Sequence, residues 1–281
     1  MNAIFRPAAA RRSTLSHAAH VEGPWNSHRV TAILLVALLA PLAAALAERG
    51  AAMLPGIVLA VFLALGWQAL FARLRRRAFG FDGLVTALAF VLMLSPATPL
   101  WQQALALSFG VVMGEQIFGG RGRNFLSPAV VALAFLLFSF PGEASPPAGA
   151  TFAAAALAGG ALLAATGLLS WRVVAGIVFG VVAASLLTGE FPDGRLALSG
   201  SLVFGIVFLA GDPVAAASTN PGRWAYGGLV GALVVVLGHA GSGPESVHAI
   251  VFAALLGGVF APSIDRIVVE ANIRRRRARH G

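Results

Sequence analysis

The sequence contains no cysteine and no lysine, and only 11% of its 281 residues are charged. The lack of cysteine excludes disulfide bonds, thiolate metal sites and cysteine-ligated iron–sulfur clusters on this chain. Of the six histidines, only His17 and His20 have a spacing suited to a shared metal, and they stand in a polar tail, so we predict no metal site. A soluble domain carries roughly 25% charged residues. Such sparse charge, beside 58% hydrophobic residues, indicates a membrane protein.

All positive side chains are arginines, and their placement is more informative than their number. Of the 20 arginines, 18 stand in alternate gaps between apolar stretches, and only Arg49 and Arg195 stand in the other gaps. This asymmetry is typical of polytopic membrane proteins that follow the positive-inside rule. It predicts that both termini are cytoplasmic, and it explains the net charge of +9 without a nucleic-acid partner. The first 24 residues lack an apolar core, so we expect no cleaved signal peptide.

Ten apolar stretches lie between these gaps. We predict an all-α integral membrane domain at 29–262, with about ten transmembrane helices in contact with lipid, flanked by basic cytoplasmic tails at 1–28 and 263–281. A straight span needs about 20 residues, so the shorter stretches indicate broken or re-entrant helices that line a buried site. The predicted helices cover 30–47, 52–71, 83–95, 101–118, 127–140, 149–170, 173–188, 197–211, 224–238 and 247–262.

The two halves of the chain resemble each other. The stretch from Leu84 to Pro96 reads LVTALAFVLMLSP, and the stretch from Leu202 to Pro213 reads LVFGIVFLAGDP, about 117 residues later. That offset corresponds to five spans, an odd number, so the second copy would lie inverted in the membrane. We predict a 5+5 inverted repeat, at about 30–140 and 149–262, with a ligand site between the halves. The alternative is chance similarity between two apolar spans.

The predicted cytoplasmic loop at 119–126 combines three glycines with two arginines. The glycines free the backbone to approach a ligand closely. Arg121 and Arg123 present planar groups suited to phosphate or carboxylate. Asn124 adds an amide, and Ser127 is placed to cap a helix that begins at Pro128. The alternative is a positive-inside loop with a helix cap and no ligand.

A second predicted cytoplasmic loop, at 211–224, begins with Asp212 where an apolar stretch breaks. Buried carboxylates are costly and usually paired. Arg223, Arg121 and Arg123 are the candidate partners. The loop also supplies hydrogen-bonding and aromatic side chains, namely Ser218, Thr219, Asn220 and Trp224. The alternative is a solvated turn.

Two single residues add to these loops. Thr151 lies at the predicted start of the helix at 149–170, on the outer side, where a helix N-terminus favours an anion such as a phosphoester. The alternative for an isolated threonine is a plain N-cap. Glu115 lies within the stretch at 101–118 and is the best candidate for an ion-coupling acid. Its alternative is a glutamate paired with a polar group inside the bundle.

Together these motifs resemble the NqrB/RnfD family, the flavin-carrying membrane subunits of the sodium-pumping NADH:quinone oxidoreductase and the Rnf ferredoxin-oxidising complex. The resemblance covers about residues 30–279, and 212–224 is its most specific part. The short N-terminal region makes the chain more similar to RnfD-like members than to the large sodium-pump subunit. The stretches that carry the resemblance are 82–87, 119–128, Thr151 within Gly-Ala-Thr, 212–224, and 261–265 with the Arg-rich tail.

The resemblance implies ten spans in a fold similar to urea transporters, with FMN esterified through its phosphate to Thr151. It implies that a flavin transferase attaches the FMN on the outer side, beside Gly149, and some members also hold a non-covalent riboflavin nearer the cytoplasm. The two loops are then candidate flavin-binding segments. The chain departs from the family motif at Ala148, where the family has Ser or Thr, and it has no acidic residue at 144–147.

The predicted function is an electron-transfer subunit of an Nqr/Rnf-type redox complex in a bacterial inner membrane. It would accept one electron at a time from a partner and relay it across or within the membrane, inward or to a quinone, with coupling to Na⁺ or H⁺ left open. No dinucleotide-binding fingerprint is present, so we expect other subunits to oxidise NADH or ferredoxin, and the chain is not an enzyme alone. The alternatives are a small-solute or vitamin transporter of the same fold without covalent flavin, and a structural membrane anchor for redox partners.

Overall fold

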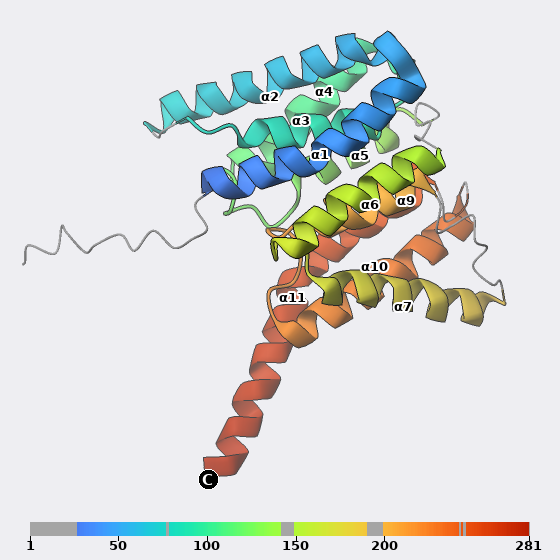
Figure 1. Cartoon of the computed structure of the whole chain (residues 1–281). Helices are drawn as coiled ribbons and strands as arrows, with labels where there is room; N and C mark the ends of the chain where they lie inside the picture. Colours follow the sequence, from blue (N-terminus) through green and yellow to red (C-terminus); the bar gives the residue numbers. More distant parts are fainter. Residues whose placement is uncertain are drawn as a thin grey trace, which may run out of the picture.

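The computed structural model describes residues 27–76, 79–141, 149–189, 199–241, 243 and 246–280. In these residues all regular structure is helical (Figure 1). The helices are α1 (Ser27–Arg49), α2 (Leu54–Leu74), α3 (Asp82–Leu92), α4 (Leu100–Val111), α5 (Pro128–Ser139), α6 (Ala150–Ala165), α7 (Trp171–Thr188), α9 (Gly200–Phe204), α10 (Asn220–Ala240) and α11 (Val247–His280). The predicted tail before residue 27, Ala148 and Arg195 lie outside the described residues.

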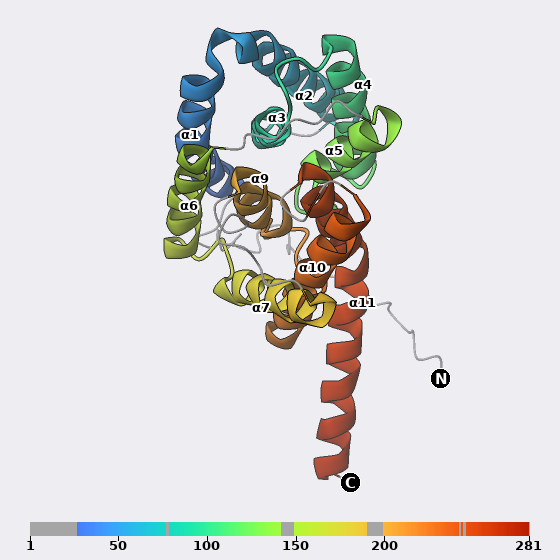
Figure 2. The same cartoon turned by 90° about the vertical axis from the view of Figure 1, so that its right-hand side faces the viewer.

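Every apolar stretch predicted from the sequence overlaps a helix, and three differ by four residues or more at one end, counting the π-helical turns with their helices. The stretch predicted at 149–170 ends at Ala165, because Gly167 adopts a φ of 77° that breaks the helix. The helix predicted at 224–238 begins earlier, at Asn220, because the hydroxyl of Thr219 accepts the N–H of Gly222. The last helix continues beyond 262 to His280, through the whole described part of the predicted tail, and projects away from the bundle (Figures 1 and 2).

Two helices carry π-helical turns, the wider helical form that often occurs at functional sites. Helix α4 continues as η3 (Val112–Gln116), which contains Glu115. Helix α9 continues as η4 (Gly205–Ala210), which ends two residues before Asp212. A short 3₁₀ turn, η2 (Gly50–Met53), joins α1 to α2. One π turn therefore contains the candidate Glu115, and the other ends close to the candidate Asp212.

The outer faces of the bundle are apolar. Within the described residues, Phe62, Phe138 and Leu187 expose 74%, 83% and 89% of their surfaces. Four helical stretches are long and apolar enough to cross a membrane: His28–Leu74, Trp171–Thr188, Asn220–Ala240 and Val247–Ala278. The shorter apolar helices are Asp82–Leu92, Pro128–Ser139, Ala150–Ala165 and Gly200–Ala210. Apolar side chains that face outward all around a bundle indicate a protein surrounded by lipid.

Helices α1 to α5 form one half of the bundle and α6 to α11 the other (Figure 2). In the first half, α3 packs on α1, α2 and α5, while α4 packs on α2 and α5. In the second half, α9 with η4 packs on α6, α7 and α11, while α10 packs on α7 and α11. The halves meet where α1 contacts α6 and where α5 contacts α11. The space between these two contacts holds the central candidate site.

Glycines allow the closest of these helix pairs. A Cβ at Gly176 of α7 would stand 3.1 Å from the Cα of Gly227 on α10. A Cβ at Gly180 would stand 3.0 Å from the Cα of Gly228, also on α10. Small residues facing one another in this way are typical of helix pairs in membranes, where close backbone approach replaces the hydrophobic driving force.

Candidate functional site

Thr151 is exposed at the start of α6, on the first helical turn. The N-cap position belongs to Gly149, whose backbone is extended, so Thr151 is the second residue of the helix and not its cap. The first N–H groups of a helix have no partner within the helix, and its N-terminus carries partial positive charge. Thr151 therefore presents a hydroxyl at a point that favours a negatively charged ester.

The hydroxyl of Thr151 donates a hydrogen bond to the carboxylate of Glu48. Glu48 lies 103 residues earlier, in the last turn of α1, and is also exposed. The carboxylate covers Gly149 too, because a Cβ there would stand 2.9 Å from the Glu48 Cδ and 3.0 Å from its Oε2. Sequence reasoning missed Glu48. Its only signal is an acid at the outer end of an apolar stretch, and nothing local links it to Thr151.

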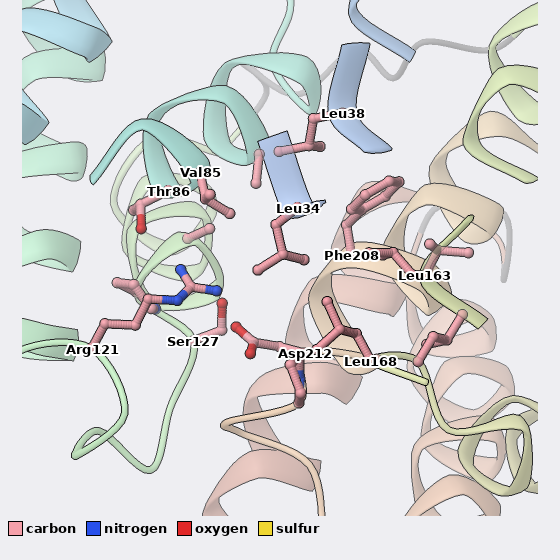
Figure 3. Close-up of a pocket in the computed structure, with 17 residues that line it drawn as sticks. Leu34, Leu38, Val85, Thr86, Arg121, Ser127, Leu163, Leu168, Phe208 and Asp212 are labelled. Carbon is pink, nitrogen blue, oxygen red and sulfur yellow. The ribbon is translucent and has the colours of Figure 1, made fainter. Parts of the chain in front are cut away.

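A small cavity lies between the two halves (Figure 3). It has a volume of about 20 Å³ and is walled largely by apolar side chains of α1, α3, α6 and η4. The side chains of Arg121 and Asp212 point toward each other across it, and Ser127 lies beside them. A cavity of this size admits a water molecule, whereas drug-sized ligands occupy about 300 Å³ or more. The cavity in this structure is therefore too small for a flavin ring.

Three polar side chains of this cavity, Thr86, Ser127 and Asp212, are buried, and the Thr86 hydroxyl is unpaired. Asp212 is 8% exposed, and its Oδ1 accepts the N–H of Val214 at 3.0 Å. Thr86 is 2% exposed, and its hydroxyl has no hydrogen-bond partner. Ser127 occupies the N-cap position of α5, but its side chain makes no capping hydrogen bond, so that part of the prediction is wrong. The side chain of Ser127 instead lines the cavity.

In the loop at 119–126, Gly119, Gly120 and Gly122 have φ values of 110°, 96° and 86°, in the region that favours glycine. Its polar side chains separate. Arg121 enters the cavity, whereas Arg123 is exposed. Asn124 is buried and holds the loop together, accepting the N–H of Gly122 at 3.0 Å and donating to the carbonyl of Leu126 at 2.6 Å.

The loop at 211–224 separates in the same way, and only Asp212 among its predicted residues reaches the cavity. Arg223 donates to the carbonyl of Ala217 at 3.3 Å, so Arg121 is the arginine that faces Asp212. Asn220 is exposed, and Trp224 packs edge-on against Trp171 at 5.6 Å between ring centroids.

Asp265 of α11 holds the Ser218–Thr219 part of that loop. The sequence analysis did not select Asp265 as a site residue. Its carboxylate accepts the N–H of Ser218 at 2.7 Å and the Ser218 hydroxyl at 2.8 Å. It also accepts the N–H and the hydroxyl of Thr219, at 3.0 and 2.5 Å. The Thr219 hydroxyl in turn accepts the N–H of Gly222. Thr219 therefore begins α10 and fixes it to α11.

Glu115 lies in η3 and is 1% exposed. Its Oε1 accepts from the amide of Gln116 at 3.0 Å. It also lines a second pocket of about 290 Å³, together with Gln68, Arg75, Asp82 and Arg121. Arg121 lines both this pocket and the central cavity, so the two adjoin. Its guanidinium is in electrostatic range of Glu115.

These features define a polytopic membrane protein, helical throughout its described regular structure, with an exposed threonine at a helix N-terminus and a charged cavity between two halves. A model of the NQR2, RnfD, RnfE family matches residues 14–148 and 142–274, and the chain belongs to that family. Among its relatives is a subunit of the Na(+)-translocating NADH-quinone reductase of Pseudomonas aeruginosa (strain LESB58). The two are 35% identical over 288 residues, which is 83% of this chain and 71% of the relative.

Two further relatives are the same subunit of that reductase in other organisms. The one from Azotobacter vinelandii (strain DJ / ATCC BAA-1303) is 35% identical over 287 residues, 83% of this chain and 71% of the relative. The one from Yersinia pestis is 34% identical over 289 residues, 82% of this chain and 70% of the relative. The family membership that the sequence motifs indicate is therefore confirmed.

Proposed function

We propose that this chain is the membrane-embedded, flavin-carrying electron-transfer subunit of an Nqr/Rnf-type redox complex. Family membership and relatives named as subunits of a sodium-translocating NADH-quinone reductase support this function. The name of these relatives implies further subunits, which would oxidise the electron donor. The same proposal includes three finer points: the chain is more similar to RnfD-like members, a quinone can accept its electrons, and it lies in a bacterial inner membrane.

The proposal includes ten spans in an inverted 5+5 repeat with both termini in the cytoplasm. Its support is the helix packing. When α1, α2, α3, α4 and α5 are matched in order with α6, α7, α9 with η4, α10 and α11, the same five helix–helix contacts occur in both halves. The contacts between the halves, α1 with α6 and α5 with α11, join matched helices, as a two-fold relation requires. The arginine distribution gives the orientation.

Thr151 is the proposed attachment point of FMN, and its surroundings fit that group. The hydroxyl is exposed, so a transferase has access to it. The first N–H groups of α6 have no partner within the helix and favour the phosphate charge. Bound there, FMN supplies one-electron chemistry. The chain itself contributes the position of the ester at the exposed N-terminal end of α6.

The central cavity does not fit a riboflavin at its volume of about 20 Å³. We therefore assign no step to a second flavin there. The same volume gives no support to the alternative of a solute transporter, because the described residues leave room between the halves for little more than a water molecule. Glu115 stays our candidate for coupling to Na⁺ or H⁺, since it is buried and lines a larger polar pocket.

The single observation that carries the flavin proposal is the exposed hydroxyl of Thr151 on the first turn of α6. The test is flavin fluorescence of the denatured protein band on a gel, after co-expression with a flavin transferase. We expect a fluorescent wild-type band and a dark Thr151→Ala band at equal membrane insertion. Thr166→Ala is the matched control, because that hydroxyl bonds only to carbonyls of its own helix and its loss should leave the band fluorescent. A dark wild-type band would refute covalent flavin.

A further inference from the structure

We propose that Glu48 is the proton acceptor for the Thr151 hydroxyl when the flavin phosphate is attached. This inference rests on the proposed function, because it concerns the same acceptor threonine. It assigns a role in the attachment to a carboxylate from the other half of the chain.

The contact itself is the first reason. The Thr151 hydroxyl donates its proton directly toward a Glu48 carboxylate oxygen, which is the geometry a general base requires. Both side chains are exposed, so an incoming phosphate can approach the threonine oxygen while the carboxylate stays in place. The residue just before Thr151 is alanine and the one before that is Gly149, so neither supplies a base.

The position of Glu48 in α1 is the second reason. A carboxylate at a helix C-terminus is unfavourable, because the carbonyl end of the helix dipole is negative. Glu48 stands in the last turn of α1, so the stability of that helix does not account for it. Its neighbour Arg49 donates to the carbonyl of Leu94 at 2.6 Å. The carboxylate instead meets the first turn of α6, whose positive end favours it.

The space around the carboxylate is the third reason. Gly149 leaves room for Glu48 to lie beside Thr151, since a Cβ at that position would stand 2.9 Å from the Glu48 Cδ. Contacts between non-bonded carbon atoms are normally about 3.5–4.0 Å. The glycine is therefore needed for the carboxylate to stay where it is, although its own φ of −81° is one that any residue adopts.

The chemical step balances with an activated FMN donor, a flavin dinucleotide in which FMN is joined to a nucleotide by a pyrophosphate. The Thr151 oxygen forms a bond to the FMN phosphorus, and the pyrophosphate P–O bond breaks. The nucleoside monophosphate leaves, and no electrons are gained or lost. The hydroxyl proton passes to Glu48 and then to water. The negative phosphodiester would repel the deprotonated carboxylate, so Glu48 should release Thr151 once attachment is complete.

The test measures the initial rate of flavin attachment to the full-length protein in detergent, with purified transferase and flavin dinucleotide, at several acceptor concentrations. General-base catalysis contributes about 10²–10⁴-fold. We therefore expect Glu48→Gln to lower the maximal rate about 100-fold, with an unchanged half-saturating concentration of acceptor. Glu48→Asp keeps the carboxylate and should recover part of the rate. Glu270→Gln, a change to an exposed glutamate paired with Arg266 on α11, should have no effect.

The outcomes separate the two proposals. A wild-type protein that acquires no flavin refutes both. A labelled wild type with Glu48→Gln within threefold of its maximal rate overturns the role of Glu48 and leaves the flavin proposal standing. A Glu48→Gln variant that changes only the half-saturating concentration also overturns it, because Glu48 would then serve recognition and not proton transfer. Equal elution of the variants in gel filtration shows that they are folded.

Discussion

Replacing Gly149 with alanine tests whether the carboxylate of Glu48 must lie beside Thr151. The added Cβ would stand 2.9 Å from the Glu48 Cδ and 3.0 Å from Oε2. Restoring ordinary contacts of about 3.5–4.0 Å moves the carboxylate away by roughly 0.5–1 Å. That displacement is enough to misalign a hydrogen bond, whose strength falls steeply with distance and angle. We expect the rate of flavin attachment to fall toward that of Glu48→Gln.

The stability of the protein should change little in Gly149→Ala. Alanine is a poorer N-cap than glycine and costs up to about 1 kcal/mol there. The substitution also lowers the conformational entropy of the unfolded chain, which raises the free energy of unfolding by about 0.4–1 kcal/mol because the extended backbone at 149 suits alanine. The displaced atoms belong to the end of a flexible glutamate, so the collision itself is relieved cheaply. A slow rate of attachment beside an unchanged melting temperature is the expected combination.

A double-mutant cycle separates this effect from recognition of the glycine by the transferase. If Gly149→Ala acts by moving Glu48, then adding it to Glu48→Gln should cause no further loss of rate. If the transferase reads Gly149 directly, the two losses should multiply. The claim that Gly149 is needed to hold the Glu48 carboxylate beside Thr151 would be refuted by either of two results. One is that the two losses of attachment rate multiply, and the other is that Gly149→Ala is labelled as fast as the wild type.

Two further substitutions probe the hydrogen bonding of the bundle. Asp265→Ala removes the acceptor of four hydrogen bonds from Ser218 and Thr219, so it should lower the free energy of unfolding by about 2–4 kcal/mol, and Asp265→Asn should have an intermediate effect. The measurement is thermal unfolding in detergent. A melting temperature equal to that of the wild type would contradict the assignment. Thr86→Val replaces a buried hydroxyl that has no partner, so the stability should stay constant or rise by up to about 1 kcal/mol. A loss above about 1 kcal/mol in the same thermal assay would mean that the hydroxyl is satisfied after all.

Hydropathy and charge predicted the helices well because each apolar stretch must satisfy its own backbone hydrogen bonds in lipid, whatever its neighbours do. The ends of the helices needed more local information, such as the cap that Thr219 provides for α10 and the break at Gly167 after α6. Asp212 was selected because an acid at the end of an apolar span costs free energy when buried, and the sequence alone shows that an acid stands there.

The partners of the selected residues were not predictable in the same way. Glu48 meets Thr151 across 103 residues, and Asp265 meets Thr219 across 46. Both pairs depend on how helices from separate parts of the chain pack, and no local pattern encodes that. The choice among three arginines for Asp212 also needed the packing, which brings Arg121 to the cavity and ties Arg223 to its own loop.

Helix α1 links the two sites while keeping them apart. Leu34 lines the central cavity, and Glu48, fourteen residues later, meets Thr151. At a rise of about 1.5 Å per residue, these positions are roughly 20 Å apart along the helix, which is much of the thickness of a bilayer. In the proposed function, the outer site is open and presents a hydroxyl to a transferase, whereas Asp212 in the cavity is buried. In the proposed function, flavin attachment at Thr151 and ion coupling at Glu115, whose pocket adjoins the cavity, are therefore separate events in space. Coupling between them would pass through the packing of helices such as α1 and α6, each of which reaches both the cavity and the Thr151 site.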